Sequence, residues 1–218
     1  MTVRLVTKRR LILVVAVLAA VLVPLAAIGG ASDWWFLRSG GAPIPTAAPQ
    51  VVKEGEWDGH PWQLVAYPSA THGLCVSITP NDSRDKGEGG AMGCGPFVGV
   101  ARTPESKASD DMTITFLAGG GSERLPAHIV GPVIEEASSV EIRFGDGDVL
   151  RVPTFAGPES LPHVRFYAAQ MPFNVRFTPG TAAAFPAWVA GLDANGNVVA
   201  CLAPRAELEG VSARSDCR

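Results

Sequence analysis

Apolar and polar residues alternate along "VEIRFGDGDVLRV", residues 140–152, on both sides of a glycine-rich interruption. Alternation with a period of two is typical of a strand with one buried face, so this stretch predicts a β-hairpin. A three-residue loop with Gly147 in the left-handed conformation closes on a glycine bulge, in which Phe144 pairs with Asp148. The loop chemistry therefore predicts the register of the two strands.

This register places four apolar residues on one face as two facing pairs, Ile142 with Leu150 and Val140 with Val152. On the other face Glu141 lies opposite Arg151, an opposite-charge pair. A two-residue loop would shift the pairing by one and turn Arg151 toward the core face. The longer loop is therefore favoured.

Similar short stretches, rich in Val, Ile, Thr and aromatic residues, recur between clusters of Gly, Pro, Asp and Asn. The predicted strands are Trp62–Tyr67, Leu74–Thr79, Met112–Leu117, Val140–Phe144, Val149–Val152, Val164–Ala169, Trp188–Leu192 and Val198–Leu202. The last two form a hairpin around Asn195-Gly196, and the apolar residues on both of its faces indicate the middle of a sheet. The pattern predicts an all-β sandwich, immunoglobulin-like or of a similar antiparallel kind, over residues 51–218.

The N-terminal segment has a different pattern, with no charged residue from Leu11 to Ala31. A helix of this length covers a hydrocarbon core of about 30 Å. Positive charges precede it at Arg4, Lys8, Arg9 and Arg10, which predicts a cytoplasmic tail at 1–10, a transmembrane helix at 11–31 and an extracytoplasmic remainder. The lipid bilayer is thus an expected partner.

A cleaved signal peptide is the alternative, because Gly29-Gly30-Ala31 offers small residues for cleavage. The length of the apolar run and an aromatic cluster at 34–36 favour an uncleaved anchor. Residues 32–50 then form an interfacial belt and a linker rich in Pro, Gly and Ala.

The charge distribution narrows the classes of partner. The chain has a formal net charge of −3, and the four positive charges of residues 1–31 leave −7 for residues 32–218. An acidic outer part argues against binding nucleic acid, which depends on a basic surface. An envelope protein or a basic ligand remains an expected partner.

The four cysteines are Cys75, Cys94, Cys201 and Cys217. Their separations exceed the close spacing of zinc ligands, and His72 is the only imidazole near Cys75, so a metal site is disfavoured. An even number of cysteines outside a membrane favours disulfides.

Of the three possible pairings, we predict Cys75 with Cys94 and Cys201 with Cys217, because each pair is local. Cys75 alternates with Leu74 and Val76, which places it on the strand face away from the core. A crosslink between Cys75 and Cys201 is the alternative.

Catalytic motifs are weak. "PSATHG" brings Ser69 near His72, but catalytic residues usually assemble from distant loops. The other histidines are His60, His128 and His163, and no serine lies in a Gly-x-Ser-x-Gly turn.

Two polar loops resemble ligand sites only in part. "LAGGGSERL" lacks the lysine of a phosphate-binding loop, and "DANGNV" lacks the last acidic ligand of a calcium loop. We therefore expect no catalytic residue, no cofactor and no metal ligand.

Several phrases carry a family resemblance: "GLCVSI", "MGCG", "GPVIEEASSVEIRFGDGDVLRVPTF", "VRFYAAQMPF" and "VAGLDANGNVVA". Over residues 60–203 the chain resembles small actinobacterial single-pass membrane proteins with an uncharacterised extracytoplasmic β domain. The resemblance implies fold and location, and it implies no active site.

Together these observations predict a membrane-anchored extracytoplasmic binding or sensing module of the bacterial envelope, without enzymatic activity. The alternative is an extracytoplasmic hydrolase with its site in surface loops. A tail of ten residues is too short to fold, so any signal would require a partner within the membrane.

Overall fold

The computed structural model describes residues 43–81, 90–100, 111–119, 121–144, 147–172 and 186–203. The chain divides into two compact units, Met1–Gly40 and Gly41–Arg218, and all the described residues lie in the second. Within these ranges there is no helix long and apolar enough to cross a membrane. The predicted tail at 1–10 and the predicted span at 11–31 lie outside the described residues.

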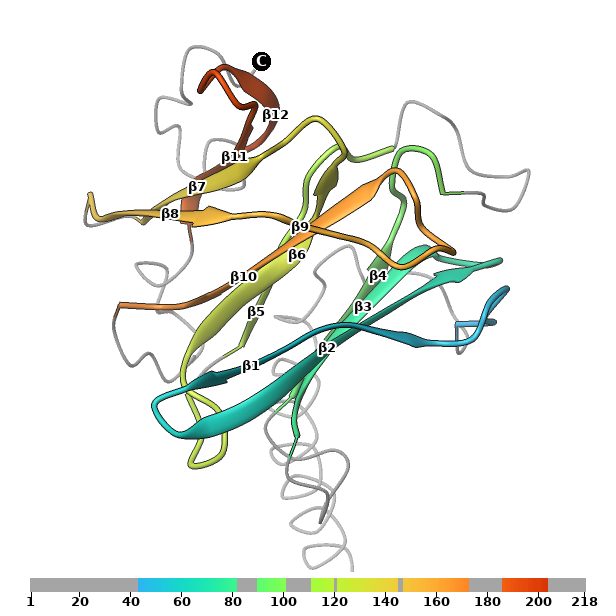
Figure 1. Ribbon diagram of the computed structural model, residues 1–218, viewed down its shortest axis with the longest axis horizontal. Coiled ribbons are helices and arrows are strands. Elements are labelled where there is room, and N and C mark those ends of the chain that lie inside the picture. Colours follow the sequence, from blue (N-terminus) through green and yellow to red (C-terminus); the bar gives the residue numbers. More distant parts are fainter. Residues whose placement is uncertain are drawn as a thin grey trace, which may run out of the picture. The chain divides into compact units, whose positions relative to one another are not determined.

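The described residues form twelve strands in three antiparallel sheets (Figure 1). The first sheet has the order β1-β2-β3-β4, from β1 (Gln50–Trp57), β2 (His60–Ser69), β3 (Gly73–Pro80) and β4 (Ala91–Gly95). The second has the order β5-β6-β10-β9, from β5 (Leu117–Gly119), β6 (His128–Ile134), β9 (Phe155–Ala156) and β10 (Val164–Gln170). The third has the order β12-β11-β7-β8, from β7 (Ser139–Phe144), β8 (Val149–Pro153), β11 (Pro186–Leu192) and β12 (Val198–Leu202). The prediction of an all-β domain is confirmed.

The second sheet contributes to two apolar cores, one on each of its faces. Along β10, Val164 and Phe166 belong to the core shared with the first sheet, whereas Tyr167 and Ala169 belong to the core shared with the third. Successive side chains of a strand point to opposite faces, so β10 is buried on both. Figure 1 shows β6 and β10 between β1–β3 and β7–β8.

Strand β6 lies inside the second sheet although it contains Gly131 and Pro132. A proline cannot donate a hydrogen bond to a neighbouring strand, which is why the sequence did not predict this strand. The Thr115 amide donates to the Pro132 carbonyl at 3.2 Å, but the reciprocal bond has no donor. The Tyr167 hydroxyl donates to the Thr115 carbonyl instead, at 3.0 Å.

Gly131 makes this substitution of donors possible. It lies directly opposite Tyr167 in the register of β6 and β10. A Cβ on Gly131 would overlap the Thr115 carbonyl oxygen, so that carbonyl leans over the glycine toward the tyrosine hydroxyl. A close backbone approach of this kind requires glycine.

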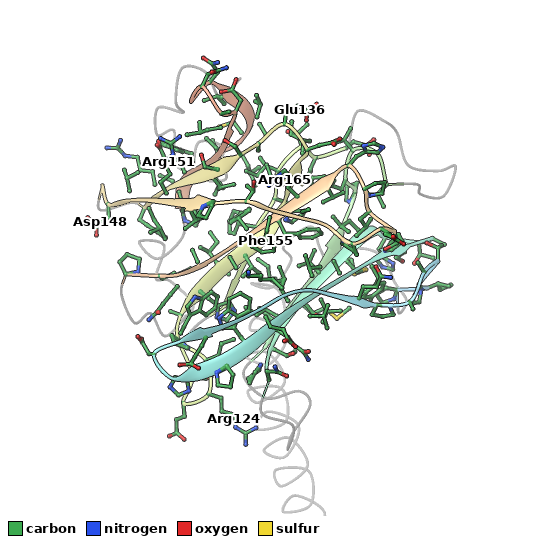
Figure 2. The ribbon with its side chains drawn as sticks, in the orientation of Figure 1. Arg124, Glu136, Asp148, Arg151, Phe155 and Arg165 are labelled. Carbon is green, nitrogen blue, oxygen red and sulfur yellow. A yellow bond between two sulfur atoms is a disulfide. The ribbon has the colours of Figure 1, made fainter. Side chains whose placement is uncertain are left out.

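The predicted register of the 140–152 hairpin is confirmed. Ile142 pairs with Leu150, Val140 with Val152, and Glu141 with Arg151. The Phe144 amide donates to the Asp148 carbonyl at 2.9 Å, and Gly147 has a φ of +100°, as the glycine bulge requires. Figure 2 shows Asp148 and Arg151 on this hairpin, where Arg151 is exposed.

A hydrogen-bonded cluster marks the point where the chain passes from the third sheet to the second. Thr154 lies between β8 and β9, and its hydroxyl donates to the Ala137 carbonyl at 2.7 Å. Arg165, labelled in Figure 2, donates to the Thr154 hydroxyl oxygen at 2.7 Å and to its carbonyl at 3.1 Å. Thr154 is buried, and these bonds satisfy its polar groups.

Other strand predictions met different outcomes. Of the predicted strand Met112–Leu117, Met112 and Ile114 form only isolated bridges, and the regular strand β5 begins at Leu117. Strand β11 lies inside its sheet as expected, whereas β12 is at the end of the described strand order, so a central position for β12 stays a prediction. Strands β1, β4, β6 and β9 were not predicted.

The end of the predicted linker lies against the domain. The Thr46 amide donates to the Pro68 carbonyl at 3.0 Å, and the Ala70 amide donates to the Ile44 carbonyl at 2.9 Å. Residues 44–46 therefore extend the contacts of the first sheet beyond the start of β1.

Candidate functional site

The first two cysteines of the chain form a disulfide as predicted. Cys75 and Cys94 face each other on β3 and β4 and are bonded with an S–S distance of 2.05 Å. They pack with Tyr67, on the face of the first sheet opposite the core residues Leu74 and Val76. Both sulfurs are buried, so this bond staples two neighbouring strands.

Cys201 is disulfide-bonded as well. The described residues contain no free cysteine, and neither Cys75 nor Cys94 is its partner. The alternative crosslink between Cys75 and Cys201 is therefore excluded. Cys217 lies outside the described residues, and its pairing with Cys201 stays a prediction.

Ser69 and His72 lie in the turn between β2 and β3. The Ser69 hydroxyl oxygen accepts the backbone amides of Thr71 and His72, at 3.4 and 3.3 Å. The Ser69 side chain is fully buried. A buried hydroxyl that closes a turn is a structural group, and it is inaccessible to a substrate.

Asp193 organises the turn between β11 and β12. One carboxylate oxygen accepts the amides of Asn195 and Asn197, each at 2.8 Å, and the other accepts the Asn197 side-chain amide at 2.9 Å. The Asn197 side chain is the largest cause of a lowered pKa at Asp193, followed by the backbone bonds. The oxygens that suggested a calcium loop are therefore used within the hairpin.

His163 is exposed, and its Nδ1 lies 2.8 Å from an oxygen of Glu135. This pair connects the segment before β10 to the end of β6 on the surface. Surface pairs of this kind contribute roughly 0–1 kcal/mol.

His128 has a different environment, because its side chain is completely buried. Nδ1 lies 2.8 Å from the Pro126 carbonyl. A carbonyl only accepts, so Nδ1 carries the proton and the neutral ring exposes a lone pair at Nε2. Among the described residues Nε2 has no hydrogen-bond partner.

The His128 ring lies directly against the backbone of Gly119 and over the ring of Trp57. A Cβ on Gly119 would overlap Cε1 and Nε2 of the imidazole. The Trp57 and His128 rings are stacked, with centroids 5.9 Å apart and an interplanar angle of 21°. The imidazole of His128 therefore fits against β5 because Gly119 has no side chain.

Trp62 completes the cluster. Its ring centroid lies 4.4 Å from that of Trp57, and its ring covers Gly55, the facing residue on β1. Trp62 is buried, and its indole N–H has no hydrogen-bond partner among the described residues. Two unpaired polar atoms, a donor and an acceptor, thus belong to side chains that contact the same Trp57 ring.

The cluster lies at one end of the core between the first and second sheets. The β1–β2 turn beside it is Asp58-Gly59, with φ values of +51° and +81°, which is typical of a tight hairpin turn. Gln170, opposite His128 on β10, donates to the Asp58 carboxylate. This bond joins the two sheets across the end of the core.

Burial is the main cause of a lowered pKa at His128, and the hydrogen bond to Pro126 opposes it. Desolvation disfavours the charged imidazolium. His128 is therefore neutral near pH 7, and it offers one buried basic atom.

The sequence did not reveal this cluster, because its members come from positions 55 to 170 and no spacing connects them. The Asp58-Gly59 turn between two tryptophans was the available signal, since such a turn flanked by apolar residues favours a hairpin. Among the described residues no group of three or more His, Cys, Asp or Glu is arranged to hold a metal ion.

Comparison with protein-family models, with curated proteins and with solved structures finds no match. The resemblance to actinobacterial single-pass proteins remains a prediction.

Proposed function

We propose that this chain is a membrane-anchored extracytoplasmic module of the bacterial envelope that binds or senses a partner. Residues 11–31 anchor it in the bilayer, and residues 1–10 lie in the cytoplasm. The β domain is a sandwich in which sheets pack face to face, and it presents loops and sheet faces to the envelope.

The Cys75–Cys94 disulfide carries this proposal. Disulfides persist in oxidising compartments and are rare in the reducing cytoplasm. Cys201, far away in the chain, is disulfide-bonded too, which adds a second structural bond of the same kind. The uncharged N-terminal run with basic residues before it supports the same orientation.

The roles of the polar side chains support binding over catalysis. Ser69 closes a turn, Asp193 organises another, and His128 holds the Pro126 carbonyl from a buried position. Ser69 and Asp193 stabilise the fold with the oxygen atoms that a catalytic group would need to offer, and the basic Nε2 atom of His128 is buried. We therefore propose a protein that recognises rather than transforms its partner.

External proteolysis of intact protoplasts tests the orientation. We expect an added protease to degrade residues 51–218 and to leave a small membrane-bound fragment, while a cytoplasmic marker protein stays intact. Protection of the domain until detergent is added would overturn the proposal. A soluble protein that begins near Ser32 would show cleavage instead of anchoring.

A further inference from the structure

The position of the proton on His128 restricts where a second proton can bind. Nδ1 already donates to the Pro126 carbonyl, so an additional proton must bind at Nε2. Nε2 lies against the Gly119 backbone and has no acceptor among the described residues. A protonated Nε2 would therefore be a buried charged donor without a hydrogen bond, which is strongly unfavourable.

The cluster offers one route to relieve this state. His128 and Trp62 are buried, whereas Trp57 is only partly buried and lies beside the exposed Asp58-Gly59 turn. Displacement of Trp57, a partly buried residue that packs against this core, would admit water toward Nε2. We propose that His128 is a pH-sensitive switch, in which protonation at Nε2 releases Trp57 and opens this end of the core between the first and second sheets.

Two effects act on the protonated ring in opposite directions. The face of the Trp57 ring attracts a cation, which favours the protonated imidazole. Burial opposes the charge, and it is the largest cause of the lowered pKa of His128, ahead of the hydrogen bond to Pro126, which favours the charge. The closed form therefore excludes the second proton.

Several charged or titratable groups lie on the elements packed against His128, and their contacts or their strand register direct most of them elsewhere. Asp58 accepts from Gln170, Lys53 lies over Phe155, and Arg165 donates to Thr154. Glu54 and Glu56 pair with residues that alternate with the core residues of β2, so they face away from the core. The remaining groups are His60 on β2 and Glu123 and Arg124 before β6, and β5 contains none.

The sign of the pH dependence follows from the lowered pKa. An exposed imidazole binds a proton below about pH 6.5, whereas the closed form resists it. As the pH falls below this value, the open form binds more protons and gains population, by up to about tenfold per pH unit until the pKa of the closed form is reached.

Hydrogen exchange of the full chain in detergent micelles at pH 7.5 and pH 5.0 tests the switch, with rates corrected for intrinsic pH dependence. In the wild type we expect the protection of backbone amides in residues 50–62 and 117–130 to be roughly tenfold lower at pH 5.0 than at pH 7.5. Peptides from 139–153 should change little. The loss should disappear in His128→Gln and persist in the controls His60→Gln and His163→Gln.

An equal loss in His128→Gln, or no loss in the wild type, would overturn the proposal. A second measurement remains valid if His128→Gln does not fold. In a variant with His60, His72 and His163 all changed to Gln, the single remaining imidazole signal in NMR reports His128 alone. We expect the pH titration of this signal to have its midpoint below pH 6.5 and to be accompanied by a change in the Trp57 indole signal. A titration midpoint at or above pH 6.5 would contradict the switch.

Discussion

At the residue scale, the second sheet depends on a few side chains that compensate for an unusual strand. Pro132 removes one backbone donor from β6, and Gly131 lets the Thr115 carbonyl approach closely. The Tyr167 hydroxyl then supplies the missing donor from the neighbouring strand β10. Because Tyr167 is fully buried, its pKa is strongly raised and the hydroxyl stays a donor at any ordinary pH.

Replacing Tyr167 with Phe should leave the Thr115 carbonyl without this bond. An unsatisfied buried acceptor costs about 1 to 3 kcal/mol, so the free energy of unfolding should fall by that amount. Denaturant unfolding of the full chain in detergent would measure it. The control is Tyr67→Phe, at the only other tyrosine, in which no bond to Thr115 is lost. Equal stability of the two variants would contradict this role of Tyr167.

At the element scale, the hairpins show how far local sequence determines structure. The alternation at 140–152 and the glycine at 147 were sufficient for the register, because turn geometry and a one-sided core select the same pairing. The sequence pattern did not predict strand β6, because it contains Gly131 and Pro132, and glycine and proline are rare in interior strands. The position of β6 also depends on Thr115 and Tyr167, which are distant from it in sequence.

The Glu141–Arg151 pair provides a test of the confirmed register in solution. Exchanging the two charges, Glu141→Arg together with Arg151→Glu, should destabilise the domain less than the sum of the single changes. The coupling should be about 0.2 to 1 kcal/mol, because the pair lies at the surface. Thermal unfolding of the four proteins would measure it. Strictly additive effects would show that the two side chains do not interact.

At the scale of the whole molecule, the three sheets of the described residues share two cores, and the buried side chains of His128 and Trp62 are part of that framework. The sequence predicted the all-β class and the Cys75–Cys94 bond, since both follow from local patterns. It could not predict the Trp57–Trp62–His128 cluster, because β1, β2 and β6 meet there only after the sheets pack. The proposed topology relative to the membrane is supported by the N-terminal sequence pattern and by the disulfides.

The oxidation state of the cysteines in living cells tests the central claim most directly. Cells are quenched with acid, and the denatured full chain is treated with a thiol-reactive polymer that adds visible mass. An extracytoplasmic domain should carry no polymer adduct before reduction and four adducts after it. A double variant with Cys75→Ala and Cys94→Ala should carry no adduct before reduction and two adducts after it. Reaction of the wild-type thiols without reduction would contradict the account, because it would place the domain in a reducing compartment.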